Sequence, residues 1–546
     1  MQGLMQSQPL LISSIIEHAA RHHSDTEIVS RTVEGGAAGG IHRYTYADAA
    51  KRAKQLAHAM GKLGVKQGDR VGTLAWNGYR HFELYFGISG IGAVMHTINP
   101  RLFPEQIAWI ANHAEDQALF FDLTFLPLVE AVAAQMTSCK NFVLMTDRAH
   151  MPAQPKVPNL RCYEDLIAPE SDVLEWPQFD ENTASSLCYT SGTTGNPKGA
   201  LYSHRSTVLH AYASALPDSL NCSARDCILP VVPMFHVNSW GLAYACPLVG
   251  AKLVLPGAQL DGKSVFELFE AEKVTMSAGV PTVWQGLLAH VKQNNLRFST
   301  LKGTVIGGSS CPPAMIKAFQ DDYGVKVLHA WGMTEMSPLG TVCNLKIKHL
   351  DWPVEKQFAI EVTQGRVVYG VDMKITGDDG TALPWDGKAF GNLMVKGPWV
   401  VREYFKGEGG DPLVDGWFPT GDVATISPDG YMQITDRSKD VIKSGGEWIS
   451  SIDLENIAVA HPAVQQAAVI GVFHPKWDER PLLIVVKRPG AEVTREELLK
   501  FFDGKIAKWW LPDDVQFTDA IPLGATGKML KTKLREQFKD YTLPAA

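Results

Sequence analysis

The sequence predicts an α/β protein. A large N-terminal domain of parallel sheets covered by helices would be completed by a small β-subdomain and followed by a small α+β domain. Three observations support this prediction: helix-like and strand-like patterns alternate from residue 41 to residue 122, short strands and turns begin near Gly365, and a charged run spans Asp436–Asp440. Such alternation is typical of parallel sheets whose faces are covered by helices. We therefore place the domains at residues 1–436 and 437–546.

The N-terminal elements follow from caps and periodicity. Thr45 and Asp48 form a capping-box pattern ahead of a helix whose apolar face runs to Leu63, and Gly64 ends it. Pro104 opens another helix. The intervening patterns predict strands at 70–76, 92–98 and 118–122 and a helix at 79–91. The proline-rich stretch 151–180 reads as a surface connection.

Later segments continue with short apolar runs that predict strands at 184–189, 226–232, 249–255, 275–279, 301–306 and 325–329. Beyond residue 365, short strands separated by turns are expected at 367–375, 391–396 and 431–435, and we expect them to pair antiparallel. In the C-terminal domain we expect a helix near 452–460, strands at 467–472 and 482–486, and a helix opened by a Thr494/Glu497 capping box.

Composition is that of an ordinary globular enzyme. The chain has 546 residues, of which 45% are hydrophobic and 20% charged, with a formal net charge of −7. The acidic balance gives no general attraction for nucleic acid. The eight cysteines are scattered without metal or redox spacing, which indicates reduced thiols. The N-terminus lacks the basic region of a signal peptide, and no stretch is long and apolar enough to span a bilayer, so we expect a cytoplasmic protein.

The most informative stretch is Tyr189–Gly199, which reads Y-T-S-G-T-T-G-N-P-K-G. A buried strand followed by a glycine- and hydroxyl-rich loop ending in lysine presents backbone N–H groups and a positive charge to phosphate. The loop is not a Walker A motif, because Pro197 and Gly199 stand where that motif requires glycine and a magnesium-binding hydroxyl. A flexible polar linker is the alternative interpretation.

The same residues resemble the phosphate loop of the adenylate-forming superfamily, which includes acyl-CoA synthetases, firefly-type luciferases and peptide-synthetase adenylation domains. The resemblance runs essentially from end to end of the chain. It implies that ATP and Mg²⁺ are used, with coenzyme A in the synthetases. By this resemblance the phosphate site comprises Thr190, Ser191, Gly192, Thr193, Thr194, Gly195 and Lys198, with Thr190 also near magnesium, and the nucleotide site extends to Gly308, Ser309 and Ser310.

Trp331–Glu335 reads W-G-M-T-E and resembles the superfamily's second signature. There the aromatic residue packs on adenine, the threonine meets the α-phosphate and the glutamate holds magnesium. This implies nucleotide contacts from Ala330, Trp331, Gly332, Met333 and Thr334, with Thr334 and Glu335 catalytic and Glu335 a metal ligand. An aromatic face suits a flat base and a carboxylate suits a hard cation. The superfamily usually has tyrosine where this chain has Trp331. Alone, such a segment is equally well a buried turn.

The C-terminal matches complete the nucleotide site. Asp422, in a T-G-D segment, resembles the carboxylate that accepts both ribose hydroxyls, although T-G-D alone is a common turn. Arg437 would be the second ribose contact and Lys439 the hinge of a mobile small domain. Lys443, Gly445, Gly446 and Glu447 resemble the surface that faces the site in the second half-reaction, on the pantetheine side.

Lys528 follows Gly527 near the C-terminus and resembles the lysine that enters the active site during adenylation. The chemistry explains the need for such a residue. A carboxylate and an α-phosphate are both anionic, and a mobile cation that bridges them offsets their repulsion in the transition state. A surface lysine is the ordinary alternative. We therefore assign Lys528 as catalytic.

Pro233–Trp240 reads P-M-F-H-V-N-S-W and lies between the phosphate and adenine motifs. In acyl-CoA synthetases the histidine here lies at the carboxylate end of the acyl pocket, and in bacterial fatty acyl-CoA synthetases the tryptophan gates the acyl tunnel. This implies a catalytic and substrate role for His236 and substrate contacts from Val237, Trp240 and Gly332. Core packing is the alternative for His236 and Trp240.

The predicted function is an ATP-dependent carboxylic acid–CoA ligase that forms an acyl-adenylate and then an acyl-CoA. The chain looks closest to bacterial medium- and long-chain fatty acid–CoA ligases, and is also similar to 3-(methylthio)propionate–CoA ligases, which share the segment type at 97–107. The alternatives are a ligase that loads a separate carrier protein, a luciferase-like oxygenase and a non-catalytic nucleotide-binding protein. The fatty acyl-CoA relatives also imply a homodimer.

Overall fold

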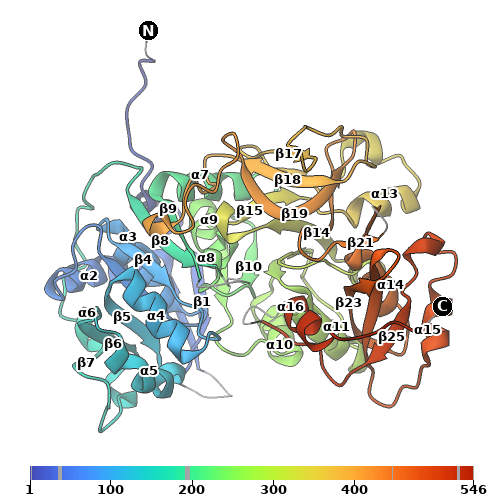
Figure 1. Cartoon of the computed structure of the whole chain (residues 1–546). Helices are drawn as coiled ribbons and strands as arrows, with labels where there is room; N and C mark the ends of the chain where they lie inside the picture. Colours follow the sequence, from blue (N-terminus) through green and yellow to red (C-terminus); the bar gives the residue numbers. More distant parts are fainter. Residues whose placement is uncertain (2, 35–39, 191–196, 445–446, 525–528, 545–546) are drawn as a thin grey trace.

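The structure is a computed structural model (Figure 1). It describes all residues except 2, 35–39, 191–196, 445–446, 525–528 and 545–546, and the side chains of 447 and 448. Two large sheets form the N-terminal body, a four-stranded sheet caps it, and a five-stranded sheet belongs to the C-terminal part. The α/β fold class predicted from the sequence is confirmed.

The first large sheet has seven strands in the order β7-β6-β5-β3-β4-β8-β9. All neighbours pair in parallel except β9, which runs antiparallel to β8. The strands are β3 (Arg70–Leu74), β4 (Val94–Thr97), β5 (Asp116–Asp122), β6 (Asn141–Met145), β7 (Leu160–Cys162), β8 (Ala184–Tyr189) and β9 (Gly199–Ser203). The phosphate-loop motif connects the last two strands.

The second large sheet has nine strands in the order β16-β15-β14-β13-β12-β10-β11-β1-β2. Its centre is parallel, and antiparallel strands lie at both edges. The strands are β1 (Glu27–Arg31), β2 (Ile41–Thr45), β10 (Cys227–Pro230), β11 (Lys252–Leu255), β12 (Met276–Gly279), β13 (Gly303–Ile306), β14 (Lys326–Gly332), β15 (Leu339–Val342) and β16 (Arg366–Val367).

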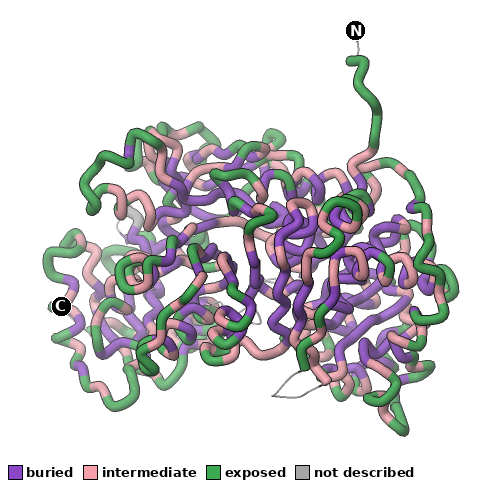
Figure 2. The backbone as a smooth tube through the Cα atoms, turned by 180° about the vertical axis from the view of Figure 1, so that it is seen from behind, coloured by how far each residue is buried: buried purple, intermediate pink, exposed green. Residues whose placement is uncertain are grey.

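Helices separate and cover the two large sheets. The largest core cluster joins the inner faces of both sheets, through residues such as Phe120 and Ile228, with α1, α2, α3, α7 and α9. A second cluster packs α10 and α11 on the outer face of the nine-stranded sheet, and a third packs α4 and α5 on the outer face of the seven-stranded sheet. The body therefore has five alternating layers. Figure 2 shows the buried residues concentrated along these layers.

The helices have these bounds: α1 (Ile12–His22), α2 (Tyr46–Lys62), α3 (Tyr79–Gly90), α4 (Pro104–Ala114), α5 (Leu126–Val132), α6 (Tyr163–Ile167), α7 (His204–Ala215), α8 (Val237–Trp240), α9 (Leu242–Val249), α10 (Gly262–Glu272), α11 (Pro281–Gln293), α12 (Pro313–Lys317), α13 (Val354–Glu361), α14 (Ser451–Val459), α15 (Arg495–Phe501) and α16 (Lys531–Gln537). The predicted capping boxes of α2 and α15 are both formed, because each N-cap threonine and its N3 carboxylate exchange hydrogen bonds. Each described helix is too short or too polar to cross a membrane.

Two antiparallel regions complete the chain. The four-stranded sheet comprises β17 (Asp372–Thr376), β18 (Gly391–Lys396), β19 (Phe418–Ile426) and β20 (Met432–Arg437). The C-terminal sheet comprises β21 (Ile442–Ser444), β22 (Glu447–Ile449), β23 (Val464–His474), β24 (Asp478–Lys487) and β25 (Asp514–Phe517). Lys439 lies between β20 and β21. The domain division at residue 436 and the hinge at Lys439 stay predictions.

The structure corrects some predicted elements. The strand expected at 367–375 is two strands, because Gly370 adopts a φ of 109° between β16 and β17. The connection 151–180 contains a strand, β7, and a helix, α6. The T-G-D segment, which resembles a turn, lies inside the nine-residue strand β19, where Gly421 has a φ of 74°. A proline and several glycines around this strand hide it from a pattern-based prediction.

Candidate active site

Two hydrogen bonds join the beginning and the end of the phosphate-loop motif. The Thr190 N–H donates to the Lys198 carbonyl oxygen at 2.8 Å, and the Lys198 N–H donates to Thr190 Oγ1 at 3.3 Å. These bonds extend the β8–β9 pairing by one step, to Thr190 and Lys198. Of the predicted phosphate residues, Ser191, Gly192, Thr193, Thr194 and Gly195 lie outside the described residues.

Tyr404, which was not predicted from the sequence, contacts both Lys198 and Glu335. The Lys198 ammonium lies 5.0 Å from the centroid of the Tyr404 ring, and the Tyr404 hydroxyl donates to Glu335 Oε1 at 2.8 Å. Burial raises the pKa of Tyr404, so its hydroxyl stays a donor. No motif marks Tyr404, because it lies on an irregular segment between β18 and β19.

Glu335 provides a site suited to a hard cation. Its side chain is buried, and no Lys, Arg or His of the described residues lies within ion-pair distance of it. No group of three or more potential ligands lies together among the described residues. Mg²⁺ is usually bound by one or two carboxylates together with substrate phosphates, so a single buried carboxylate such as Glu335 is compatible with it. The assignment of Glu335 and Thr190 to magnesium stays a prediction. The carbonyl of Thr334, the residue before Glu335, accepts a hydrogen bond from the Tyr202 hydroxyl at 2.5 Å.

A second contact joins the adenine and ribose motifs. The Trp331 indole N–H donates to Asp422 Oδ2 at 3.0 Å, and Arg437 Nε lies 2.9 Å from Asp422 Oδ1. Asp422 is 2% exposed, whereas Arg437 is on the surface. Asp422 and Arg437 are directly paired residues of β19 and β20. Three residues predicted from separate motifs are therefore in direct contact.

The remaining nucleotide residues follow two neighbouring parallel strands. Ala330, Trp331 and Gly332 end β14, and Gly308, Ser309 and Ser310 follow β13. Gly332 has no room for a side chain, because a Cβ would lie 1.9 Å from the Pro338 carbonyl oxygen. Ligands of parallel sheets bind at such strand ends. Met333 continues from β14 into the short helical turn of Thr334 and Glu335.

The segment after His236 is a left-handed turn. Val237, Asn238, Ser239 and Trp240 have φ between 45° and 55°, and Gly241 follows at 81°. Left-handed backbone costs non-glycine residues about 1–2 kcal/mol each. A run of four such residues therefore persists only where surrounding contacts hold it, and strained backbone of this kind is concentrated at functional sites.

Side-chain hydrogen bonds hold this turn. Ser239 Oγ donates to the Val232 carbonyl at 3.0 Å, and Asn238 Nδ2 donates to Ser186 Oγ on β8 at 2.9 Å. Asn77 fixes the approach to the turn, because its amide donates to two carbonyls of 230–232 and accepts from the Met234 N–H at 2.6 Å. Asn77 was not predicted. Its role depends on contacts between distant segments.

Trp240 lies against the glycine turn that follows β13. A Cβ on Gly307 would lie 3.4 Å from Trp240 Cη2, and a Cβ on Gly308 would lie 3.5 Å from Cζ2. The indole therefore lies close to this glycine turn. The structure thus brings Trp240 and Gly308, predicted from different motifs, together.

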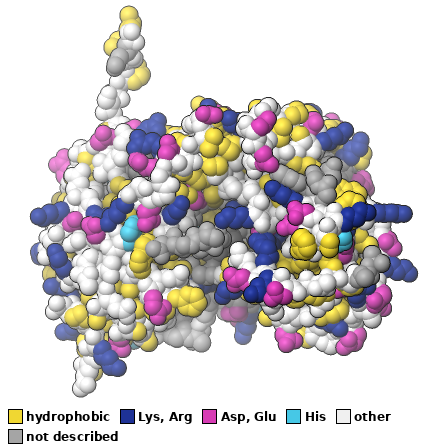
Figure 3. All heavy atoms as spheres, viewed as in Figure 1, with side chains coloured by type: hydrophobic (Ala, Val, Ile, Leu, Met, Phe, Trp, Pro, Cys, Tyr) yellow, Lys and Arg dark blue, Asp and Glu magenta, His cyan; other side chains and the backbone are white. Residues whose placement is uncertain are grey.

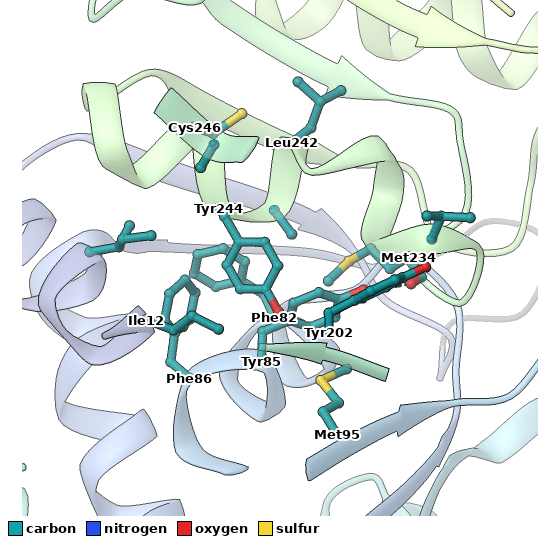
Figure 4. Close-up of a cluster of buried hydrophobic side chains, with 14 of the residues drawn as sticks. Ile12, Phe82, Tyr85, Phe86, Met95, Tyr202, Met234, Leu242, Tyr244 and Cys246 are labelled. Atoms are coloured by element: carbon teal, nitrogen blue, oxygen red, sulfur yellow. Dashed lines mark hydrogen bonds between the residues drawn. The ribbon is translucent and has the colours of Figure 1, made fainter. Parts of the chain in front are cut away.

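The space beside His236 is small. A cavity of 20 Å³ is lined by Thr97, Leu102, Cys188, Phe235, His236 and Val237, among others. Figure 4 shows Tyr85, Met95, Tyr202, Met234 and Tyr244 in one cluster of buried side chains, with the Tyr244 ring directed toward Tyr85. The Tyr85 and Tyr244 ring centroids are 5.3 Å apart. Large aromatic side chains therefore fill the interior next to the turn.

The C-terminal part faces the body across a cavity of 480 Å³, lined by Ser310 and Cys311 on the body and by α14 and residues 505–510 on the other side. Figure 3 shows the face seen in Figure 1, hollowed near its middle and with Lys and Arg side chains along the hollow. Lys439 and Lys443 are exposed, and the Lys443 N–H donates to Glu479 Oε2 at 2.9 Å. Gly445, Gly446 and Lys528 lie outside the described residues, and so does the side chain of Glu447.

Comparison with known proteins gives two family matches and several relatives of nearly full length. A family described as AMP-binding enzyme matches residues 16–405, and the AMP-binding enzyme C-terminal domain matches residues 453–528. A 3-methylmercaptopropionyl-CoA ligase of Ruegeria lacuscaerulensis is 57% identical over 99% of both chains. A medium-chain fatty acid–CoA ligase of Ectopseudomonas oleovorans is 52% identical over 100% of this chain and 98% of its own. Among solved structures, an anthranilate CoA ligase in complex with anthranoyl-AMP has a TM-score of 0.85, with 25% identity over 98% of each chain.

Proposed function

This chain belongs to the AMP-binding enzyme family, and on that premise we propose that it is an ATP-dependent carboxylic acid–CoA ligase acting through an acyl-adenylate. The observation that carries the proposal is the convergence of the Trp331–Asp422–Arg437 contact with the Lys198–Tyr404–Glu335 contact. The first suits the base and ribose of a nucleotide, and the second suits its phosphates and their cation. The enzyme class agrees with ligases that are more than half identical to this chain.

In the first half-reaction a carboxylate oxygen of the acid attacks the α-phosphorus of ATP. The bond from that phosphorus to the bridging oxygen breaks, pyrophosphate leaves and an acyl-adenylate forms. Lys198 and the loop after Thr190 would bind the phosphates, and Thr334 would contact the α-phosphate. Mg²⁺, when held by Glu335 and Thr190, would supply positive charge to the leaving pyrophosphate. Lys528 would bridge the two anionic partners.

In the second half-reaction the thiol of coenzyme A attacks the acyl carbonyl carbon. The carbon–oxygen bond to AMP breaks, AMP leaves with that oxygen, and the thiol proton passes to solvent. His236 would lie at the carboxylate end of the acyl site, and Gly332 would contact the acyl group through its backbone. Lys443, Gly445, Gly446 and Glu447 would face the site in this step, after the small domain rotates at Lys439.

We propose that short apolar acids such as 3-methylmercaptopropionate are preferred, with medium-chain fatty acids as the second candidate. The large aromatic side chains that fill the interior next to the turn at 237–241 support the short acid. The identity to a 3-methylmercaptopropionyl-CoA ligase points the same way, and that to a medium-chain ligase supports the second candidate.

The test is AMP release in the presence of ATP, Mg²⁺ and coenzyme A over acids from acetate to palmitate, with 3-methylmercaptopropionate, butyrate and branched acids included. We expect the highest kcat/KM with 3-methylmercaptopropionate or a short fatty acid. A maximum at octanoate or longer would mean that Trp240 opens a tunnel. Exchange of pyrophosphate into ATP without thioester formation would move the assignment to a carrier-protein ligase, and nucleotide binding without either reaction to a non-catalytic protein.

We further propose that the enzyme works in the cytoplasm as a homodimer. The cytoplasm supplies ATP and coenzyme A and keeps thiols reduced, which suits eight unpaired cysteines, seven of them buried. The dimer is expected from the resemblance to fatty acyl-CoA synthetases. Light scattering coupled to gel filtration tests it, because a mass near 59.8 kDa would identify a monomer.

A further inference from the structure

The contact between Trp331 and Asp422 joins two sheets that the chain builds separately. Trp331 lies on β14, beside an irregularity in the β14–β15 pairing, and Asp422 lies on β19, one residue before an irregularity in the β19–β20 pairing. Irregularities of this kind turn side chains away from the regular alternation between the two faces of a sheet. Here the two side chains meet at 3.0 Å.

The Trp331 indole packs against the neighbouring strand β15. A Cβ on Gly340 of β15 would lie 2.7 Å from both Cε3 and Cζ3 of the indole, so the ring packs directly on the glycine backbone. The indole therefore has little freedom to rotate away from Asp422. A tyrosine at this position would carry its polar hydrogen at a different point of the ring.

Asp422 is fixed from both sides before any nucleotide arrives. Its Oδ2 accepts the Trp331 N–H, and its Oδ1 pairs with Arg437 Nε at 2.9 Å. Each carboxylate oxygen has two acceptor positions, so these bonds do not prevent it from accepting a hydroxyl as well. Because the carboxylate is almost fully buried, each hydrogen bond to it contributes to its orientation, and loss of the Trp331 donor weakens that constraint.

We infer that Trp331 positions Asp422 for the ribose hydroxyls through its indole N–H, in addition to offering an aromatic face to the base. Trp331 is then a positioning residue for ribose recognition, and base and ribose binding are coupled. The inference rests on the proposed function only in taking a nucleotide as the ligand. A carboxylate whose orientation is set in advance binds two hydroxyls without first losing side-chain freedom.

The test compares the affinity of AMP with those of 2′-deoxy-AMP and 3′-deoxy-AMP by calorimetry, in wild type, Trp331→Phe, Asp422→Asn and the double variant. Phenylalanine keeps an aromatic face but has no N–H, and asparagine leaves Trp331 in place. We expect Trp331→Phe to weaken AMP by about 10- to 100-fold and the deoxynucleotides by much less. The two substitutions should be non-additive for AMP, because both remove the same ribose contact.

An equal loss for AMP and both deoxynucleotides in Trp331→Phe would overturn the inference, because it would mean that the indole acts by stacking alone. An unchanged AMP affinity would overturn it too, as would a wild type that binds all three nucleotides alike. Thermal melting of each variant checks folding, and Asp422→Asn tests the ribose contact even if Trp331→Phe is unstable. Nucleotide discrimination without acyl-CoA formation would contradict the proposed function and leave this inference standing.

Discussion

At the scale of single residues, Tyr404 shows how an unmarked side chain completes the site. Its hydroxyl donates to Glu335 and its ring lies beside the Lys198 ammonium. The hydroxyl and the ring can be separated by experiment, because phenylalanine removes only the hydroxyl. Glu335 would then lose the donor that orients it, while Lys198 would keep its aromatic neighbour.

We therefore predict that Tyr404→Phe lowers kcat for pyrophosphate release about 10-fold and raises the Mg²⁺ concentration needed for half-maximal rate. A hydrogen bond to a charged group is worth about 1.5–3 kcal/mol, which sets this scale. Titrating Mg²⁺ at saturating ATP measures it. Tyr369→Phe is the matched control, since Tyr369 is 90% exposed. An unchanged Mg²⁺ dependence in Tyr404→Phe would contradict the assigned role.

Asp122 is a residue where burial makes stability depend on pH. It ends β5, accepts the Trp76 N–H at 2.7 Å and is 7% exposed. Burial raises the pKa of Asp122 from 3.8 to about 7. The folded protein therefore holds this proton more tightly than the unfolded chain, so the stability present below pH 4 is lost as the pH rises to about 7.

We predict that Asp122→Asn is close to neutral below pH 4, increasingly stabilising between pH 4 and 7 and fully stabilising above pH 7, because asparagine cannot ionise and its amide oxygen can still accept the Trp76 N–H. The pKa difference corresponds to at most about 4 kcal/mol. Melting temperatures of variant and wild type between pH 5 and 8.5 measure the trend. Asp172→Asn, at an exposed aspartate, provides the control. A constant difference across this range would show that Asp122 does not titrate there.

At the scale of elements, the left-handed turn at 237–241 is the clearest example of a local structure that distant contacts impose. Gly241 closes it with a φ of 81°, and a Cβ there would lie 2.5 Å from the His210 ring. His210 itself accepts the Leu339 N–H at 3.1 Å, and burial lowers its pKa to about 3, so the ring is neutral and cannot easily move. The turn therefore depends on a glycine at this position.

Gly241→Ala should lower the melting temperature by several degrees and raise KM for the acid more than KM for ATP, because Trp240 would shift away from Gly307 and Gly308. Gly64→Ala is the control that separates the cost of left-handed backbone from the cost of the steric clash. Gly64 has a φ of 80° but open space around it, so this substitution measures the backbone cost alone, about 1 kcal/mol. Equal effects on both substrates would mean that the turn supports the fold only.

At the scale of the whole molecule, the small C-terminal part is tied to the body near Lys439 by buried polar contacts. The Ser451 N–H at the start of α14 donates to Asp436 on β20 at 2.7 Å, and the Ser450 hydroxyl donates to the Thr435 carbonyl on the same strand. These contacts define one orientation of the two parts. Rotation at Lys439 would exchange them for others.

We predict that Lys528→Ala abolishes most acyl-adenylate formation, by about 100-fold or more, but changes thioester formation from supplied acyl-adenylate far less, since Lys528 would face the site only in the first step. Separate assays of pyrophosphate release and of thioester formation measure this. Lys533→Ala, at an exposed lysine on α16, is the control. Equal loss in both half-reactions would argue against two orientations.

Local periodicity and side-chain chemistry predict the α/β class, most of the strands of the parallel sheets and the capping boxes of α2 and α15. The sequence also marked Trp331, Asp422 and Arg437 as candidate nucleotide residues. It missed β19, whose proline and glycines resemble turns, and it read 367–375 as one strand where Gly370 breaks it. Local patterns cannot distinguish a bulged strand from a turn without its neighbours.

Which of these residues are in contact follows from the packing of the folded chain. The bonds from Trp331 to Asp422, from Tyr404 to Glu335 and from Asn77 to 230–234 join segments far apart in the chain. The left-handed turn before Gly241 was likewise invisible, since its residues have no intrinsic preference for that backbone. Each depends on packing between sheets, and the free energy that offsets the local strain comes from contacts made only when the chain is folded.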